Sequence, residues 1–316
     1  MRVMITGGCG FVGSHLVDHH LEAGDGVVVV DDLSTGRLDN LDLTRPSLTV
    51  VNASAVRPLA SFAVDRIYHL GSPASPRAYQ ARPLETIAAN TVGTTNMLEA
   101  AHKSGARLLF ASTSEVYGDP LVHPQPEEYR GNVDPYGPRS AYDESKRCGE
   151  AICRAYEQER GVDVRVARIF NTFGPRMAPD DGRVVPSMIV SALRGEPLVI
   201  EGDGHQTRSF MYVDDLVRGL VALMESDVRG PVNLGNPVET TILELAIAIR
   251  DLTGSPRSAS PGPRPALEYV DAAPDDPRRR RPDVTRARRE LDWYPKTELD
   301  DGLFHTIEYF RTLFTT

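Results

Sequence analysis

The fold is decided by residues 2–13, RVMITGGCGFVG. Residues 2–6 predict a short strand, residues 7–13 a glycine-rich turn, and residues 14–23 a helix with apolar side chains at helical spacing. A dinucleotide site needs glycine where the turn is tight, where backbone approaches the pyrophosphate, and where the helix packs on the strand. Gly7, Gly10 and Gly13 fit these three roles, so the stretch predicts a dinucleotide-binding unit.

An acidic residue after the next strand indicates which dinucleotide binds. Val27–Val30 is typical of a buried parallel strand, and Asp31 follows eighteen positions after Gly13. A carboxylate there accepts hydrogen bonds from the ribose hydroxyls and repels a 2'-phosphate, which favours NAD over NADP. The alternative is a glycine-rich turn with a nearby helix-capping Asp. The other residues that we expect to contact NAD are Phe11, Val12, Asp32, Ser34, Thr35, Gly36, Asn52, Leu70, Ser72, Ser112, Tyr142 and Lys146.

The composition indicates a soluble globular protein. The chain has 316 residues, of which 41% are hydrophobic and 25% charged, enough for a large core in two lobes. A net charge of -9 repels nucleic acid, and the apolar runs are shorter than the ~20 residues of a membrane helix. The three cysteines lack metal-ligand spacing and fit reduced thiols, and the first strand begins at Arg2. We therefore expect a cytoplasmic protein without a metal site, a nucleic-acid partner or a membrane span.

Strand-like runs alternate with helical stretches through the first half of the chain. The runs are 3–6, 27–31, 48–51, 66–70, 107–111 and 164–169. This alternation predicts an α/β fold with a Rossmann-like, doubly wound parallel sheet. The clearest helix spans residues 83–103, with Gly105 just past its end as a C-cap.

After residue 176 the pattern changes to loops rich in Pro, Gly and Arg between shorter helices at 184–194, 213–224 and 242–252. We expect an NAD-binding Rossmann domain of residues 1–176 with returning segments at about 209–240. A smaller C-terminal α/β substrate lobe would comprise residues 177–208 and 241–316. Residues 275–282 contain only Asp, Pro and Arg, which predicts a solvated loop or a linker.

The catalytic residues are predicted where one strand ends and the next helix begins. Strand 107–111 delivers residues 112–115 to the carboxyl edge of the sheet, where ligands of open α/β sheets bind. Tyr142 and Lys146 are four residues apart and so share one face of a helix. A phenol has an ordinary pKa of about 10, but a nearby ammonium and a nicotinamide cation both favour phenolate. Tyr142 could then remove a hydroxyl proton, with Thr113 sharing the hydrogen bond; an exposed Tyr and Lys on a helix is the alternative.

Longer motifs resemble one enzyme family. They are SPASP at 72–76, STSEVYGDP at 112–120, GPR at 137–139, RIFNTFGPR at 168–176, DGRVV at 181–185, GDGHQTRSF at 202–210 and DDPRRRRPD at 275–283. With the glycine loop and the Tyr142 and Lys146 pair, nearly the whole chain resembles the extended short-chain dehydrogenase/reductase family that modifies nucleotide sugars. Within that family the motifs are similar to those of the UDP-glucuronate decarboxylases.

The resemblance implies NAD-dependent decarboxylation of UDP-glucuronate to UDP-xylose through a 4-keto intermediate, with NAD recycled. It implies catalytic roles for Thr113, Ser114, Glu115, Tyr142 and Lys146. Related 4,6-dehydratases carry an Asp-Glu pair after the threonine, and 4-epimerases generally lack the glutamate, whereas this chain has Ser114 and Glu115. We expect the substrate carboxylate to raise the pKa of Glu115, which would then reprotonate C5 directly or through an ordered water. A solvated loop carboxylate is the alternative for Glu115.

Other functions stay open at this point. One is another nucleotide-sugar enzyme, a 4-epimerase or a 4,6-dehydratase. A second is an NAD-responsive regulatory or scaffold protein on the same fold. A third is an enzyme that releases the 4-keto sugar together with NADH.

The resemblance also assigns the UDP-sugar site. The residues expected there are Ser75, Tyr79, Asn171, Arg183, Arg208 and Arg278, although each arginine could instead be solvated and Tyr79 could be a core residue. Relatives usually carry an Asp after the third strand to contact adenine, whereas this chain has Asn52, so we expect weaker NAD binding. In relatives the helices corresponding to 83–103 and 142–159 form a four-helix interface, which predicts a homodimer.

Overall fold

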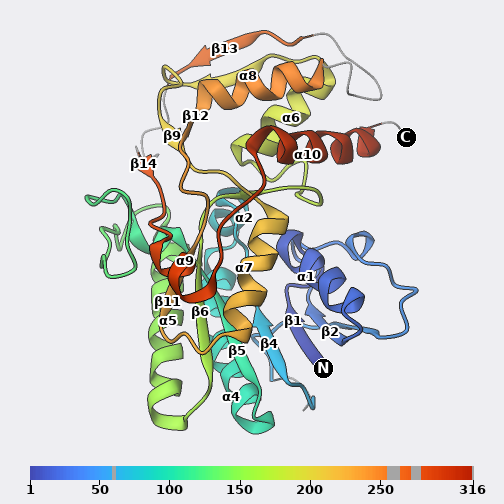
Figure 1. Ribbon diagram of the computed structural model, residues 1–316, viewed down its shortest axis with the longest axis vertical. Helices are drawn as coiled ribbons and strands as arrows, with labels where there is room; N and C mark the ends of the chain where they lie inside the picture. Colours follow the sequence, from blue (N-terminus) through green and yellow to red (C-terminus); the bar gives the residue numbers. More distant parts are fainter. Residues whose placement is uncertain (59–61, 255–263, 272–278, 315–316) are drawn as a thin grey trace.

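Seven parallel strands form the central sheet of the computed structural model, which describes residues 1–58, 62–254, 264–271 and 279–314. They lie in the order β11-β6-β5-β4-β1-β2-β3 (Figure 1). Their bounds are β1 Arg2–Thr6, β2 Gly26–Asp31, β3 Leu48–Asn52, β4 Arg66–His69, β5 Arg107–Thr113, β6 Val164–Ile169 and β11 Pro231–Leu234. All six strands expected from the sequence are in this sheet, and the predicted doubly wound parallel fold is confirmed.

Side chains of the central strands alternate between two apolar layers. Val3 and Ile5 of β1 belong to the core on one face and Met4 to the core on the other. Successive strand residues point to opposite faces, so a sheet that is covered on both sides needs a continuous apolar run. The run Val27–Val30 of β2 meets this need, and none of its residues is more than 1% exposed.

Helices cover both faces of the sheet. α1 (Phe11–Glu22) and α7 (Val213–Glu225) pack on one face, and α4 (Thr94–Ser104) and α5 (Ser140–Arg160) on the other. The helix predicted over 83–103 consists of α3 (Pro83–Ala88), the π-helical stretch η2 (Ala89–Gly93) and α4. Within η2, buried Asn90 donates a hydrogen bond of 2.9 Å to Ser145 Oγ of α5. Gly105 ends α4 with φ 72°, as the sequence predicted.

The other large helices gather above the carboxyl ends of the strands (Figure 1). α6 (Val184–Arg194), α8 (Ile242–Thr253) and α10 (Leu299–Phe314) pack against one another beside the two-stranded sheet of β8 and β13. α7 and β11 lie between α6 and α8 in the chain, so the upper part of the molecule leaves the main sheet and returns to it. The remaining elements are η1 Leu38–Asn40, α2 Pro76–Ala81, η3 Ser114–Tyr117, β7 Thr172–Phe173, β8 Leu198–Glu201, β9 Thr207–Arg208, β10 Met211–Tyr212, β12 Thr240–Thr241, β13 Leu267–Val270, β14 Arg279–Arg280 and α9 Thr285–Leu291.

The end of the arginine-rich segment corrects one prediction. The sequence predicted a solvated loop or linker at 275–282, but β14 pairs with β9, and Arg280 is only 5% exposed. Arg281 donates its N–H to Gln125 Oε1 and accepts from the Gln125 N–H at its carbonyl, both at 2.9 Å. The reason is that a distant loop supplies partners for a segment whose composition alone is typical of a surface.

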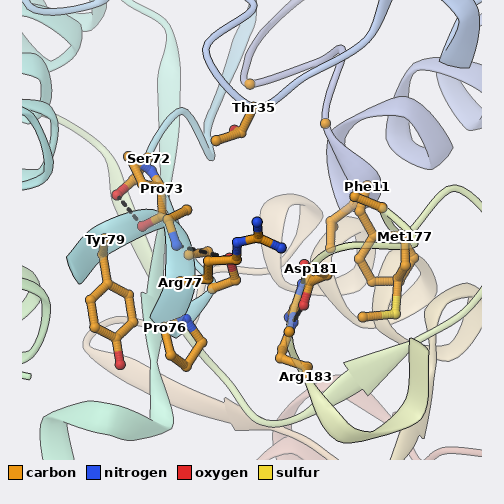
Figure 2. Close-up of a pocket in the computed structure, with 18 of the residues that line it drawn as sticks. Phe11, Thr35, Ser72, Pro73, Pro76, Arg77, Tyr79, Met177, Asp181 and Arg183 are labelled. Carbon is orange, nitrogen blue, oxygen red and sulfur yellow. Dashed lines mark hydrogen bonds and ion pairs between the residues drawn. The ribbon is translucent and has the colours of Figure 1, made fainter. Parts of the chain in front are cut away.

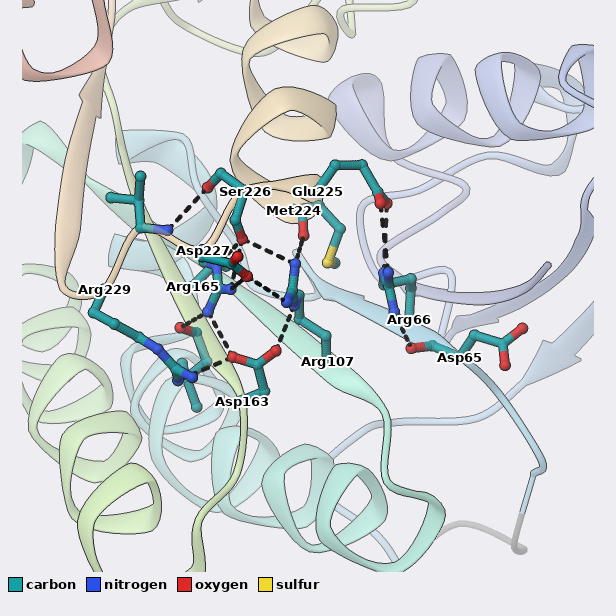
Figure 3. Close-up of polar contacts among 12 residues, drawn as sticks. Asp65, Arg66, Arg107, Asp163, Arg165, Met224, Glu225, Ser226, Asp227 and Arg229 are labelled. Carbon is teal, nitrogen blue, oxygen red and sulfur yellow. Dashed lines mark hydrogen bonds and ion pairs between the residues drawn. The ribbon is translucent and has the colours of Figure 1, made fainter. Parts of the chain in front are cut away.

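A cluster of ion pairs joins neighbouring strands at their amino ends, the edge of the sheet opposite the carboxyl ends (Figure 3). The side chain of Arg165 is fully buried and donates to Asp163 Oδ1 at 2.7 Å and to the Ser226 carbonyl. Arg107 binds the other oxygen of Asp163 at 2.5 Å. These residues join β5, β6 and the end of α7 at the amino edge, away from the carboxyl ends where the sheet binds ligands.

Candidate active site

A cavity of about 1570 Å³ lies at the carboxyl ends of the strands. Its walls come from the turn between β1 and α1, the ends of β2, β4 and β5, the start of α5, and the loop before α6. β1 has β2 on one side and β4 on the other, so the chain winds away from β1 in both directions. Open α/β sheets bind ligands at this kind of reversal, which makes the cavity the candidate active site.

The glycine turn forms a close-fitting wall of this cavity. Gly7 has φ +71°, and a Cβ added to Gly13 would lie 2.1 Å from the carbonyl oxygen of Gly7. The turn therefore brings its backbone and the start of α1, which follows Gly10, to the cavity surface. The first N–H groups of a helix lack partners within the helix and attract phosphate. This cradle fits the pyrophosphate of NAD.

Asp31 lies beside the same wall at the carboxyl end of β2. Its Oδ2 accepts from the Cys9 N–H and its Oδ1 from the Leu33 N–H, both at 2.9 Å. Burial raises the pKa of this carboxyl, and the two backbone hydrogen bonds oppose the rise. The bonds hold the carboxylate at the cavity, where it can accept from ribose hydroxyls as the sequence predicted.

Most of the predicted cofactor residues line the cavity. They are Gly7, Gly10, Phe11, Val12, Gly13, Asp31, Asp32, Ser34, Thr35, Leu70, Ser72, Ser112, Tyr142 and Lys146. Gly36 and Asn52 do not line it. Gly36 packs behind Asp31, since an added Cβ would lie 3.0 Å from both carboxylate oxygens. Asn52 is exposed at the end of β3, and Ala53 and Ser54 line the cavity instead.

Tyr142 and Lys146 lie on the first turns of α5 and both reach the cavity. The Thr113 hydroxyl lowers the pKa of the Tyr142 phenol through a hydrogen-bonding interaction. Lys146 Nζ donates to the Ala111 carbonyl at 2.7 Å and lies 5.8 Å from the centroid of the Tyr142 ring. Burial lowers the pKa of Lys146 to about 7. Lys146 Nζ is therefore held at the end of β5, close to the phenol ring.

The protonation of Tyr142 depends on more than its neighbour on the helix. The sequence predicted that the nearby ammonium and a nicotinamide cation both favour phenolate. In the structure burial raises the pKa of the Tyr142 phenol, Glu115 and Asp143 raise it further, and Thr113 opposes the rise. The protein groups by themselves therefore favour the protonated phenol, so a phenolate would depend on the positive charge of the bound nicotinamide.

Glu115 is held between two arginines. Its carboxylate oxygens form ion pairs with Arg139, just before α5, and Arg280 of β14. Burial alone would raise the pKa of Glu115, but the charges of Arg280 and Arg139 and their hydrogen bonds outweigh it and lower the pKa. The protein's own groups therefore keep this doubly paired carboxylate ionised, and the rise expected from a substrate carboxylate stays a prediction.

Five of the six predicted substrate residues line the cavity, namely Ser75, Tyr79, Asn171, Arg183 and Arg208. Tyr79 stacks on Tyr142 with ring centroids 4.8 Å apart and an interplanar angle of 8°. Figure 2 shows Arg183 beside Asp181, which it binds at 2.8 Å. Arg208 donates to the Thr207 carbonyl and is 8% exposed. Arg278 lies outside the described residues.

Comparison with known proteins decides the family. Residues 3–235 match the NAD dependent epimerase/dehydratase family. The chain belongs to this family. The family resemblance inferred from the motifs is thereby confirmed.

Individual members of the epimerase/dehydratase family resemble the chain closely. UDP-glucuronic acid decarboxylase 1 of Xenopus tropicalis is 53% identical over 98% of this chain and 72% of its own length. A UDP-glucose 4-epimerase of Thermotoga maritima, solved with UDP-glucose, has a TM-score of 0.89 and 31% identity, covering 99% of this chain and all of the other. A UDP-glucuronic acid 4-epimerase of Bacillus cereus, solved with UDP-4-deoxy-4-fluoro-glucuronic acid and NAD, has a TM-score of 0.86 and 25% identity, covering 99% and 100%.

Three residues of this epimerase/dehydratase site escaped the sequence reasoning. Arg139 belongs to the GPR motif, but nothing in the motif indicates a partner. Arg280 is one of four consecutive arginines, which composition cannot tell apart. Asp143 is buried next to Tyr142 in the chain, and burial, together with the charge of Glu115, raises its pKa to about 7.

Two further findings concern the described ranges. No group of three or more His, Cys, Asp and Glu side chains there could hold a metal ion. No helix within the same ranges is both long and apolar enough to cross a membrane.

Proposed function

We propose that the protein converts UDP-glucuronate and a proton to UDP-xylose and carbon dioxide. One observation carries the proposal: Glu115, with Arg139 and Arg280, forms a charged cluster in the same cavity as Tyr142. This cluster provides guanidinium groups for a uronate carboxylate. The 53% identity to a UDP-glucuronic acid decarboxylase over 98% of the chain supports the same substrate.

The reaction begins at the sugar C4 hydroxyl. Bound NAD supplies a hydride acceptor and, later, the hydride donor. The positive charge of the bound nicotinamide would favour the phenolate of Tyr142. The phenolate accepts the C4 hydroxyl proton, and Thr113 shares the hydrogen bond and orients the ring. The product of this step is a 4-keto sugar whose carboxylate lies on the adjacent carbon, which makes it a β-keto acid.

Decarboxylation follows from that chemistry. The C5–carboxylate bond breaks, carbon dioxide leaves, and its electron pair forms an enolate with the C4 oxygen. Tyr142 stabilises this oxygen by hydrogen bonding and returns its proton to it when the C4 ketone is reduced again. Because two arginines keep Glu115 ionised, we propose that it holds the water that reprotonates C5 rather than donating its own proton.

The substrate residues divide between the two ends of the ligand. We propose that Arg208, Asn171 and Arg183 bind the UDP end, together with Arg278. Arg280 is suited to the uronate, because its Nε is buried and has no hydrogen-bond partner within the described part of the chain. Ser75 and Tyr79 are proposed to close over the sugar from α2.

Incubation with UDP-glucuronate and a trace of NAD tests the proposal. We expect carbon dioxide and UDP-xylose in equal amounts, with no lasting accumulation of NADH. A 4-epimerase would instead give an epimeric uronate without carbon dioxide, and an enzyme that releases the keto sugar would accumulate NADH stoichiometrically. Either result would overturn the proposal.

We further propose a cytoplasmic homodimer that pairs through α3, η2, α4 and α5. Leu84 and Val92 on the first two elements are 77% and 47% exposed. Cys148 on α5 is an exposed free thiol, which a reducing compartment preserves. The predicted division into residues 1–176 with 209–240, and 177–208 with 241–316, stays a proposal as well.

A further inference from the structure

Glu150 lies four residues beyond Lys146 on α5, so the two side chains share a helix face. Ser112 Oγ donates to Glu150 Oε1 at 2.5 Å. Arg168 of β6 binds both carboxylate oxygens, through Nε to Oε1 at 2.9 Å and through Nη2 to Oε2 at 2.7 Å. A bidentate, charge-assisted pair of this kind fixes the carboxylate in place.

Arg168 is held in turn from the far side. Its Nη1 donates to Tyr117 Oη at 2.9 Å, and Tyr117 Oη donates to Asn233 Oδ1 at 2.8 Å. The side chains of Arg168 and Glu150 are only 12% and 17% exposed. A chain of hydrogen bonds therefore runs from Asn233 of β11 to Ser112 at the end of β5.

Several groups from three elements face Lys146. They are Phe110 and the Ala111 carbonyl of β5, His69 of β4, and Tyr142, Cys153 and Glu150 of α5 itself. Burial lowers the pKa of His69 to about 3 and raises that of the Cys153 thiol, so both are uncharged at neutral pH. Burial also raises the pKa of the Tyr142 phenol. Glu150 is the one carboxylate among these described groups.

We propose that Glu150 is a positioning residue for the catalytic pair. Its carboxylate, anchored by Arg168, keeps Lys146 an ammonium ion and holds Ser112 in place beside Thr113. The effect of Glu150 on catalysis rests on the proposed function, but its effect on the charge of Lys146 can be measured without substrate.

The sign of the effect follows from the charges. Burial lowers the pKa of Lys146 to about 7, and Cys153 and Glu150 act against it; since the thiol is neutral, the opposing charge is that of Glu150. Glu150→Gln removes this anion and leaves the Arg168 cation unpaired, so the pKa of Lys146 falls. Arg168→Gln leaves the anion unopposed, so the pKa rises. The double variant removes both charges, so the pKa of Lys146 returns toward its wild-type value.

Nuclear magnetic resonance of isotope-labelled lysine measures this directly in the NAD-bound protein. The chain has only three lysines, Lys103, Lys146 and Lys296, and Lys146→Arg identifies the signal. We expect Glu150→Gln to lower the titration midpoint of Lys146 by about one pH unit or more. Arg168→Gln should raise it. Glu157→Gln, on the same helix but paired with Arg154 and Arg229, is the matched control and should leave it unchanged.

The pH dependence of UDP-glucuronate turnover gives a second readout. If the ammonium is required, activity falls as pH rises through the pKa of Lys146. Glu150→Gln should move this loss of activity to lower pH, and Arg168→Gln should move it to higher pH. A one-unit fall reduces the ammonium fraction at pH 7 from about one half to about one tenth. A lower rate with an unmoved midpoint would mean a merely structural role for Glu150 and would overturn the inference.

The two proposals fail in different ways. If wild-type protein releases no carbon dioxide but the Lys146 midpoint moves as expected, the proposed function is wrong and the role of Glu150 stands. If Glu150→Gln does not fold, the titration midpoint of Lys146 in Arg168→Gln and in the double variant still tests the role of Glu150. An unchanged or lowered midpoint in Arg168→Gln would then contradict the proposal.

Discussion

Tyr142 shows how one residue balances opposing interactions. Burial, Glu115 and Asp143 raise the pKa of the phenol, while Thr113 and the charge of the bound nicotinamide act in the opposite direction. Tyr142→Phe removes the proton acceptor but keeps the ring, so we expect turnover of UDP-glucuronate to fall about 1000-fold while NAD still binds. Tyr136→Phe is the control, since Tyr136 is 97% exposed, and it should keep full activity. Product analysis measures both, and an active Tyr142→Phe variant would assign the proton transfer to another group.

A second residue-scale prediction concerns the ring that covers Tyr142. Tyr79 is 1% exposed and stacks on Tyr142 at 4.8 Å. An aromatic pair contributes about 1 kcal/mol beyond its buried area, so Tyr79→Leu should lower kcat about fivefold. Tyr79→Phe keeps the stack and should retain kcat. Steady-state kinetics on both variants compares them, and equal losses would show that the hydroxyl matters rather than the stack.

Helices and strands whose own residues determine them were predicted from the sequence. Those that depend on contacts with residues far away in the chain were not. The run Val27–Val30 predicts a buried strand by itself, and α6 spans the predicted residues 184–194. β14 was missed, because the partner of Arg280 is Glu115, 165 positions earlier in the chain. The same distance explains why the sequence did not indicate that Arg280 lowers the pKa of Glu115. Motifs place a residue at the sheet edge, but its charge depends on which side chains fold against it.

The glycine turn yields a prediction at the scale of the element. Gly13→Ala would set a Cβ 2.1 Å from the Gly7 carbonyl oxygen, and this neighbour is backbone that cannot rotate away. Overpacking costs about 1–3 kcal/mol, so we expect NAD affinity to fall about tenfold or more. Gly26→Ala is the control, since its added Cβ would meet nothing closer than 3.9 Å. Calorimetric titration measures the NAD affinity of both variants. Equal affinities would show that the turn can accommodate a Cβ at position 13.

At the scale of the whole molecule, the short helix α3 presents apolar side chains to solvent. Leu84 and Ile87 of α3 are 77% and 40% exposed, while Thr86 between them is fully buried against the fold. Hiding such side chains against a second copy would stabilise a dimer, whereas a charge there would be buried at a cost. We therefore expect Leu84→Glu with Ile87→Glu to convert a dimer to a monomer in sedimentation equilibrium. Leu121→Glu, at a site 82% exposed but distant from this helix in the chain, should leave the dimer intact. Wild-type protein that sediments as a monomer at micromolar concentration would show that this face has no partner.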